Sequence, residues 1–208
     1  MTTIVDYGIG NLRSLAKAFD AAGVSVRRSG SPAEIATADR LVLPGVGAFG
    51  ACAQELRDRG LDAPVRQRVA EGAPLLGVCV GMQLLFEGST ERGEHEGLGL
   101  LPGRVERFPS DLSDANGTRL KVPHMGWNRL DVRQPHPVVG RGDDWVYFVH
   151  SYRAVAAPSD ILAVAQYGIE VPAVVGRGHV VGVQFHPEKS ARAGQAMLRR
   201  FADWTPDR

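Results

Sequence analysis

A cysteine between two glycines is the first feature of this sequence that could do chemistry. Cys79 lies at the centre of Gly77-Val78-Cys79-Val80-Gly81, directly after the apolar residues Leu75 and Leu76. Where a strand turns sharply into a helix, a nucleophile is held in a strained backbone conformation, and glycines two residues away on either side let the strand and the helix pack closely. The helix N-terminus adds partial positive charge, which favours a thiolate. The pattern therefore predicts a nucleophilic Cys79, with the backbone N–H of Val80 directed at the reacting carbonyl oxygen.

The second cysteine has a different setting. Cys52 falls in the segment 49–59, whose pattern predicts an ordinary helix closed by Gly60. Cysteine is often only a small buried apolar residue, and we expect that role for Cys52. With two cysteines and no C-x-x-C pair, the sequence supports neither a disulfide framework nor a zinc cluster. We expect no metal and no cofactor.

A histidine and a glutamate flank a proline near the end of the chain. His186-Pro187-Glu188 follows the apolar segment 179–185. Proline disfavours helical geometry at the preceding residue, so we expect extended chain, in which residues i and i+2 project to the same side. Glu188 can then hold one imidazole nitrogen of His186 while the other faces a nucleophile, as in a Cys-His-acid triad. On its own, the His-x-Glu pattern is equally typical of a surface turn. The presence of Cys79 in the same sequence favours the catalytic interpretation of this pattern.

A glycine-rich turn, Pro44-Gly45-Val46-Gly47, follows the apolar residues 41–43. Its backbone N–H groups could stabilise an oxyanion, cradle a phosphate or simply close a tight turn. The glycines permit two backbone arrangements of this turn. The sequence contains no Walker-type motif, and Gly8-Ile9-Gly10 has no third glycine at Arg13. Nucleotide binding of these kinds is therefore not indicated.

The elements that must position these residues are typical of an α/β fold. Strand-like segments at 3–5, 24–26, 41–43 and 75–78 alternate with helical periodicity at 12–22, 49–59 and 79–86. This alternation predicts right-handed crossovers and a parallel sheet, with Cys79 and His186 at the C-terminal ends of strands. From residue 97 to 182 the helical period fades into short strand-like runs, and a helix with Ala193, Met197 and Phe201 on one face ends the chain. We therefore predict one α/β domain over residues 1–208, with an additional antiparallel β region.

The composition excludes several kinds of partner. Lys and Arg number 24 and Asp and Glu number 23, which gives a formal net charge of +1. Neither nucleic acid nor a membrane surface is therefore indicated as a partner. The apolar runs are far shorter than the ~18 residues of a membrane-spanning helix, and the first residues lack the pattern of a signal peptide. We expect a cytoplasmic protein.

These segments together resemble the class-I, or triad, glutamine amidotransferases. The resemblance rests on Gly77-Val78-Cys79-Val80-Gly81-Met82-Gln83, on His186-Pro187-Glu188 and on the 44–47 turn, and it covers essentially the whole chain. It implies a three-layer, flavodoxin-like fold with a mostly parallel central sheet. Three further segments, 6–11, 86–91 and 122–128, resemble the glutaminase subunits of imidazole glycerol phosphate synthases within that class. Val80 stands where a leucine is more usual, and its backbone N–H remains available.

The resemblance implies a role for each site residue. Cys79 would attack the side-chain amide of glutamine, His186 would shuttle the proton, and Glu188 would orient His186. Ammonia would leave, and water would hydrolyse the thioester to glutamate. The N–H groups implied for the oxyanion are those of Val80, Gly45, Val46 and Gly47. The residues implied for glutamine binding are Gln83, Glu91, Ser151 and Tyr152, each of which could instead be a packing or surface residue.

The resemblance also implies a partner, a (β/α)8-barrel cyclase subunit in a heterodimer. An amine with a pKa near ~10 is mostly protonated at neutral pH and then no longer nucleophilic. A sheltered channel would keep the ammonia neutral on its way to the cyclase. Asn11, Trp127 and Lys189 lie in segments that would face this partner, although Trp127 could instead be a core aromatic and Lys189 a solvated charge.

Three other functions stay open at this stage. The chain could supply ammonia to another synthase, for example in the anthranilate or pyridoxal phosphate pathway, although the segment 122–128 argues against it. It could be a stand-alone cysteine hydrolase, which would turn over without a partner. It could also be a catalytically silent binding subunit, which the intact Cys79, His186 and Glu188 disfavour.

Overall fold

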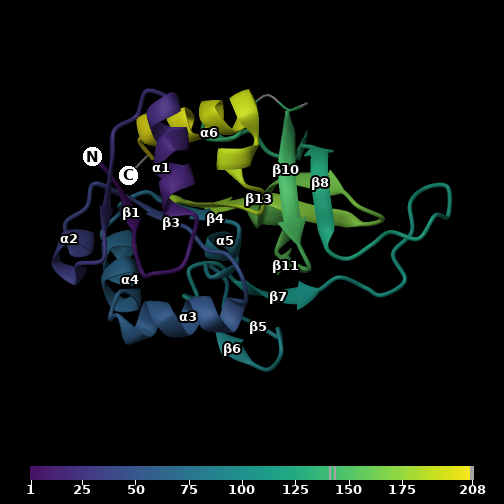
Figure 1. Cartoon of the computed structure of the whole chain (residues 1–208), viewed down its shortest axis with the longest axis horizontal. Helices are drawn as coiled ribbons and strands as arrows, with labels where there is room; N and C mark the ends of the chain where they lie inside the picture. The colour runs from purple at the N-terminus through teal and green to yellow at the C-terminus, as the bar shows by residue number, and fades with distance from the viewer. Residues whose placement is uncertain (141, 143, 207–208) are drawn as a thin grey trace.

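A central eight-stranded sheet organises the chain (Figure 1). The computed structural model describes residues 1–140, 142 and 144–206. In spatial order the strands are β2 (Val26–Ser29), β1 (Thr2–Val5), β3 (Arg40–Leu43), β4 (Leu75–Val78), β14 (Val180–Val183), β13 (Glu170–Arg177), β12 (Ile161–Gln166) and β9 (Asp131–Val132). The first five strands are parallel to one another and the last three join antiparallel. The predicted α/β class is confirmed.

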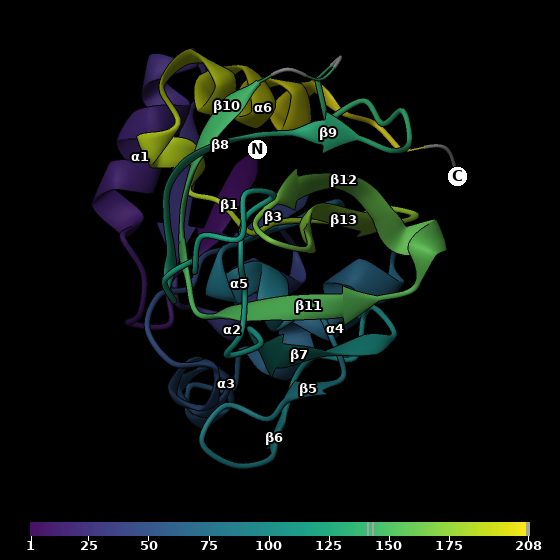
Figure 2. The same ribbon diagram turned by 90° about the vertical axis from the view of Figure 1, so that its right-hand side faces the viewer.

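Helices cover both faces of this sheet (Figures 1 and 2). One face carries α1 (Leu12–Ala21) and α6 (Ala191–Asp203). The other face carries α3 (Phe49–Asp58), α4 (Asp62–Ala70) and the short α5 (Val80–Gln83), and α2 (Pro32–Ala36) packs beside α4. Single 3₁₀ turns are η1 (Pro158–Asp160) and η2 (Pro187–Lys189). A sheet covered on both faces has strands that are apolar throughout, and β1, β4 and β14 are buried along their whole length.

The register of β4 and β14 brings the chemistry-bearing segments together. The two strands are parallel, with Gly77 opposite Gly182 and Val78 opposite Val183. Their last residues are therefore level at the C-terminal edge of the sheet. Cys79 follows β4 immediately, and His186 follows β14 after two further residues. This edge is where parallel sheets build their sites.

Two small, largely antiparallel sheets flank that edge, and one pairing within the second sheet is parallel. The first pairs β10 (Trp145–His150) with β8 (His124–Arg129). The second runs in the order β11 (Tyr152–Ala156), β7 (Gly103–Arg107), β5 (Gly88–Ser89) and β6 (His95–Glu96). Figure 2 shows β10 and β11 following one another around the end of the main sheet. They form the additional antiparallel region that the sequence predicts.

Several boundaries differ from the expectation. The helix after Cys79 ends at Gln83 instead of continuing through Phe86, and β14 ends at Val183 instead of Phe185. Neither α2 nor α4 was predicted from the sequence. Helix α4 has a proline at its third position and only Val65 and Val69 buried, so its apolar face is weak. Strand β8 also went unassigned, because its sequence HMGWNR lacks an apolar–polar alternation.

Candidate active site

Cys79 occupies a strained turn between β4 and α5. Its φ is +55°, a left-handed value that costs energy for a residue with a side chain. The Cys79 N–H donates to the Val183 carbonyl at 2.8 Å, which ties the turn to β14. A Cβ at Gly81 would lie 1.9 Å from the Leu43 carbonyl oxygen, and one at Gly77 would lie 2.7 Å from the Gly81 oxygen. Both positions therefore require glycine, as the sequence pattern predicts for a nucleophile held at a strand end.

His186 and Glu188 are hydrogen-bonded to each other. His186 Nδ1 lies 2.8 Å from Glu188 Oε1, and both side chains are about 5% exposed or less. The expectation of extended chain holds at His186, with φ −99° and ψ 100°, but it is wrong at Glu188, which lies in the 3₁₀ turn η2. The reason is that the fixed φ of Pro187 also suits the first position of a helical turn. Ser190 Oγ donates to the His186 carbonyl at 2.7 Å and holds this turn in place.

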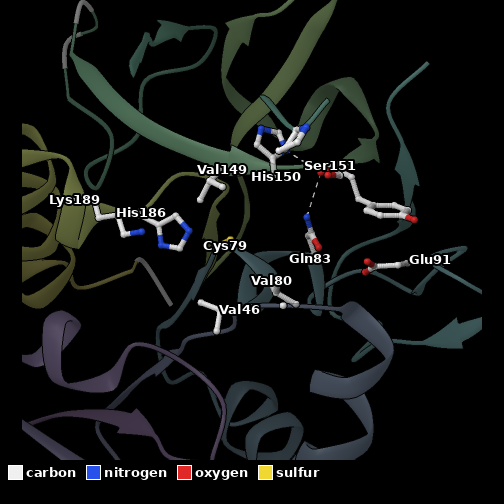
Figure 3. Close-up of a pocket in the computed structure, with 13 residues that line it drawn as sticks. Val46, Cys79, Val80, Gln83, Glu91, Val149, His150, Ser151, His186 and Lys189 are labelled. Carbon is white, nitrogen blue, oxygen red and sulfur yellow. Dashed lines mark hydrogen bonds between the residues drawn. The ribbon is translucent and has the colours of Figure 1, made fainter. Parts of the chain in front are cut away.

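The environment of His186 favours its cationic form. Burial lowers the pKa of the imidazole, but hydrogen bonds with Cys79 and Glu188 and the charges of these two groups outweigh it and raise the pKa to about 10. An imidazolium beside a cysteine stabilises the thiolate that acts as nucleophile. Figure 3 shows the His186 ring pointing toward Cys79. The geometry places the Cys79 side chain beside an imidazolium that the buried Glu188 carboxylate orients.

One cavity of about 390 Å³ joins most of the predicted residues (Figure 3). Its lining is Val46, Gly47, Cys79, Val80, Gln83, Glu91, Pro123, Val149, His150, Ser151, Tyr152, His186 and Lys189. The size suits a small polar ligand. Gly45 is buried beneath the cavity, and a Cβ there would meet the Gly81 nitrogen at 2.6 Å. Of the predicted site residues, Gly45, Glu188, Asn11 and Trp127 do not line it.

The 44–47 turn engages Val80 directly. The Val80 N–H donates to the Gly45 carbonyl at 3.3 Å, so this donor is already occupied in the arrangement that the structure shows. Two buried side chains hold the neighbouring peptide units: Tyr7 OH donates to the Pro44 carbonyl at 2.7 Å, and Cys52 Sγ lies 3.2 Å from the Val46 carbonyl. The Gly45–Val46 peptide lies between these two peptide units. Among the described hydrogen bonds, its carbonyl meets the Val80 N–H and no side chain.

The far wall of the cavity is formed by residues predicted to bind glutamine. Gln83 Nε2 donates to the Tyr152 carbonyl at 3.2 Å and to Gln184 Oε1 at 3.0 Å. Glu91 Oε2 accepts from the Phe49 N–H at 2.7 Å and therefore ties the 86–91 segment to α3. Ser151 lies beside Tyr152 at the same wall.

Two polar residues near Cys79 were not predicted from the sequence. Gln184 is fully buried, and its Nε2 lies 4.0 Å from Cys79 Sγ. His150 lines the cavity and is 6% exposed. The sequence signal that could have identified Gln184 is its place directly after the apolar strand 180–183, because a buried amide needs hydrogen-bond partners.

The three residues predicted to face a partner are exposed. Asn11 precedes α1, Lys189 ends η2, and half of the Trp127 side chain on β8 is accessible. Lys189 Nζ lies 5.6 Å from the Tyr147 ring, and the Trp127 ring meets the same tyrosine edge-on at 6.0 Å. The core alternative for Trp127 is therefore wrong, and the two side chains share one surface around Tyr147.

Two buried histidines, His150 in the cavity wall and His124 behind it, give the fold a pH-dependent stability. Burial lowers the pKa of His124 to about 4 and that of His150 to about 3. An unfolded histidine has a pKa near ~6.5, so the unfolded chain takes up protons first as pH falls. We expect the free energy of unfolding, measured in urea, to decrease between pH 6.5 and 4 by on the order of 5 kcal/mol for the two histidines together.

The control for this prediction is the variant His124→Phe, which retains an aromatic ring without a titrating group. Its free energy of unfolding should fall less steeply than that of the wild type over the same pH range. An equal slope in both proteins would contradict the assignment of the effect to the buried histidines.

The family comparison agrees with this geometry. Residues 3–204 match the family model for the class-I glutamine amidotransferase domain. The chain belongs to the class-I glutamine amidotransferases. The predicted resemblance is thereby confirmed, as is the predicted enzyme class.

Close relatives of this amidotransferase carry one common name. The protein named imidazole glycerol phosphate synthase subunit HisH in Salinibacter ruber is 54% identical to this chain over 205 residues, which cover 97% of this chain and 94% of the relative. The next two relatives have the same name. In Syntrophotalea carbinolica the identity is 48% over 206 residues, covering 98% and 100%. In Bacillus velezensis it is 49% over 203 residues, covering 97% and 95%.

Solved structures share the fold of this amidotransferase. A crystal structure of a glutamine amidotransferase has a TM-score of 0.74 at 22% identity, with 97% of each chain covered. The structure of PurLQS from Thermotoga maritima has a TM-score of 0.72 at 18% identity, again covering 97% of each chain. At these identities the likeness concerns the fold.

Two further properties concern the described part of the amidotransferase. No group of three or more His, Cys, Asp or Glu side chains is placed there to hold a metal ion. Across the same residues, no helix has both the length and the apolar character for a membrane crossing.

Proposed function

We propose that this chain is the glutaminase subunit of an imidazole glycerol phosphate synthase, which acts in histidine biosynthesis. One observation carries the chemistry: the strained Cys79 lines the same cavity as His186, whose imidazole is hydrogen-bonded to the buried Glu188. The relatives at about half identity over nearly the full chain support the choice of synthase.

The reaction follows from the roles we assign to these three residues. Cys79 Sγ attacks the side-chain amide carbon of glutamine and forms a tetrahedral intermediate. Protonated His186 gives its proton to the departing nitrogen, and the C–N bond breaks to release ammonia and leave a γ-glutamyl thioester. Neutral His186 then takes a proton from water, whose oxygen attacks the thioester, and glutamate leaves Cys79. Glu188 stabilises the imidazolium at each stage.

The oxyanion of the tetrahedral intermediate requires a rearranged 44–47 turn. The Val80 N–H becomes free only when the Gly45 carbonyl turns away from it. Rotation of the Gly45–Val46 peptide would release Val80 and direct the Val46 N–H to the opposite side of that peptide. Each oxyanion donor contributes about 3 kcal/mol to barrier lowering. We therefore propose that the chain alone turns over slowly and that a liganded partner favours the rotated state.

The partner in this proposal is a (β/α)8-barrel cyclase that consumes the ammonia. Free ammonia at neutral pH would become the non-nucleophilic ammonium ion. The exposed surface of Trp127, Tyr147 and Lys189 adjoins the His186 turn, and Asn11 lies next to Glu188 at a small cavity. This surface is where we place the cyclase.

Replacing Trp127 with alanine tests the partner surface. Tryptophan side chains at interface centres often contribute 2 kcal/mol or more, so we expect Kd for the cyclase to increase by roughly 30-fold. Isothermal titration calorimetry with the purified cyclase measures this. The matched control is Val155→Ala on β11, which removes another exposed apolar side chain and should leave Kd unchanged. Equal affinity of the Trp127 variant and the wild type would place the cyclase elsewhere.

Glutamate release from glutamine tests the function as a whole. It is measured for the chain alone, with the cyclase, and with the cyclase and its nucleotide substrate. Slow turnover alone that rises by about 10²-fold or more in the liganded complex is expected from the gain of an oxyanion donor. Fast turnover that ignores the cyclase would instead identify a stand-alone hydrolase, and activation by a different synthase would identify a different ammonia consumer.

A further inference from the structure

His124 and His150 belong to one continuous series of hydrogen bonds behind the cavity. They face each other across the β8–β10 pair, with 2.9 Å between His124 Nδ1 and His150 Nε2. His150 Nδ1 lies 2.8 Å from the Tyr152 carbonyl oxygen. His124 Nε2 lies 3.3 Å from the side-chain amide nitrogen of Asn128. The series therefore runs from β8 to the wall of the cavity.

The Tyr152 carbonyl determines the tautomers of both rings. A carbonyl only accepts, so His150 Nδ1 carries a proton, and a neutral His150 then accepts at Nε2. His124 Nδ1 must donate to it, which leaves His124 Nε2 to accept from the Asn128 amide. Burial keeps both rings neutral, because it lowers the pKa of each far below 7. Each hydrogen bond of the series is thus donated in the direction from Asn128 toward Tyr152. One additional proton on either ring would place two donors opposite each other.

The Tyr152 carbonyl also connects the histidines to the nucleophile. It accepts a second hydrogen bond, from Gln83 Nε2 at 3.2 Å. The same amide donates to Gln184 Oε1 at 3.0 Å, and Gln184 Nε2 lies 4.0 Å from Cys79 Sγ. Figure 3 shows the hydrogen bonds of the Gln83 and His150 side chains as dashed lines. The position of the 150–152 segment relative to Cys79 therefore depends on both hydrogen bonds that the Tyr152 carbonyl accepts, one from His150 and one from Gln83.

Aromatic rings fix the histidines in this geometry. His124 is stacked between Phe148, at 4.6 Å and 20°, and Tyr167, at 4.1 Å and 26°. Phe108 packs against His150 at 5.1 Å. A ring held between two others cannot reorient to find a different partner. The tautomers and the direction of the series are consequently built into the packing.

We propose that His124 and His150 are positioning residues that hold the 150–152 segment in place for glutamine binding. The kinetic part of this inference rests on the proposed function. His150 anchors the Tyr152 carbonyl, and His124 orients His150 without lining the cavity itself. Loss of His124 should therefore weaken glutamine binding and leave the chemistry at Cys79 intact. Through Asn128, next to Trp127, the series also reaches the strand that we assign to the partner surface.

The variant His124→Phe tests the positioning role, because it keeps the aromatic stack and removes both ring nitrogens. In the complex with the cyclase, we expect KM for glutamine to rise roughly three- to tenfold, the equivalent of one lost hydrogen bond, while kcat changes less than about twofold. The matched control is His136→Phe, a half-buried histidine packed edge-on against Trp204, whose KM should equal that of the wild type. An unchanged KM in His124→Phe, or the same rise in both variants, would overturn the proposal.

A second measurement does not depend on glutaminase activity. Nitrogen NMR of the imidazoles in the full chain should show both rings neutral and protonated at Nδ1 from pH 8 to 5. His186 and Tyr167 are titratable groups that face the pair, and Tyr167→Phe checks that the tyrosine hydroxyl is not the source of any shift. Detection of an Nε2–H tautomer in either ring, or of a ring that titrates near pH 6.5, would overturn the proposed series of hydrogen bonds. A chain without glutaminase activity would instead overturn the proposed function, and the NMR result would still decide the inference.

Discussion

Alanine in place of Cys79 is expected to lower glutamate release by about 10³-fold or more, because no thioester can form without the sulfur. The structure gives the physical basis. Cys79 is held at a positive φ between β4 and α5, and its side chain meets His186 in the cavity. Cys79 is buried, and alanine keeps its Cβ and removes only the sulfur, so the fold should persist. The measurement is steady-state glutamate release at saturating glutamine in the liganded complex.

The second cysteine is a matched control for this experiment. Cys52 is also free and buried, but it does not line the cavity, and its sulfur lies against the Val46 carbonyl. Cys52→Ala should retain activity within several-fold of the wild type, and a glutamine-analogue electrophile should still label it at Cys79. An equal loss in both variants would show that the cysteines matter for packing. More than a tenth of the activity remaining in Cys79→Ala would exclude it as the nucleophile.

The parallel half of the fold could be predicted because its elements depend on local pattern. The segments 3–5, 41–43 and 75–78 are short apolar runs that end at turn residues, and each is a strand of the main sheet. The antiparallel half depends more on contacts between distant segments. Strand β8 pairs with β10 across a separation of about twenty residues, and its alternate side chains are partly exposed. Such pairing leaves little trace in the sequence of either strand alone.

The site was predictable where backbone geometry restricts the residue type. Gly77 and Gly81 mark the turn at Cys79 because no other residue fits there. Gln184 and His150 were missed because their places near Cys79 arise from the register of β13, β14 and β10, which no single segment encodes. The contact between Gly45 and the Val80 N–H was equally hidden. It depends on which of two arrangements the glycine turn adopts, and the sequence allows both.

Glutamine in place of Glu188 is expected to lower kcat for glutamate release by about 10²-fold or more, because the amide cannot stabilise the imidazolium. Glu188 Oε1 accepts from His186 Nδ1 at 2.8 Å, and the pair is buried. A glutamine of the same shape keeps the packing, so KM should change much less than kcat. The matched control is Glu87→Gln on the surface. Among the described hydrogen bonds, the Glu87 carboxylate accepts one, from the Gly103 N–H at 2.9 Å. That variant should keep wild-type kcat.

The pH dependence of the Glu188→Gln variant separates electrostatic orientation from simple structural damage. In the wild type, contacts with Cys79 and Glu188 raise the pKa of His186 to about 10. The imidazolium that donates the proton therefore persists into alkaline solution, and its loss sets the alkaline limb of kcat/KM. Without the carboxylate the pKa of His186 falls, so the alkaline limb should move to lower pH. A lower kcat with an unmoved limb would show that Glu188 only packs against the ring.

The same pair makes an independent contribution to stability, with a sign that can be worked out. The pKa of His186 is higher in the folded chain than the ~6.5 of an unfolded histidine, so the folded state retains its proton at higher pH. The stabilisation is then complete below about pH 6.5 and disappears as pH rises toward the folded value. Glu188→Gln should accordingly reduce the free energy of unfolding more at pH 6 than at pH 10. Urea denaturation at the two pH values measures the difference, and a cost that grows with pH would contradict a charged His186–Glu188 pair.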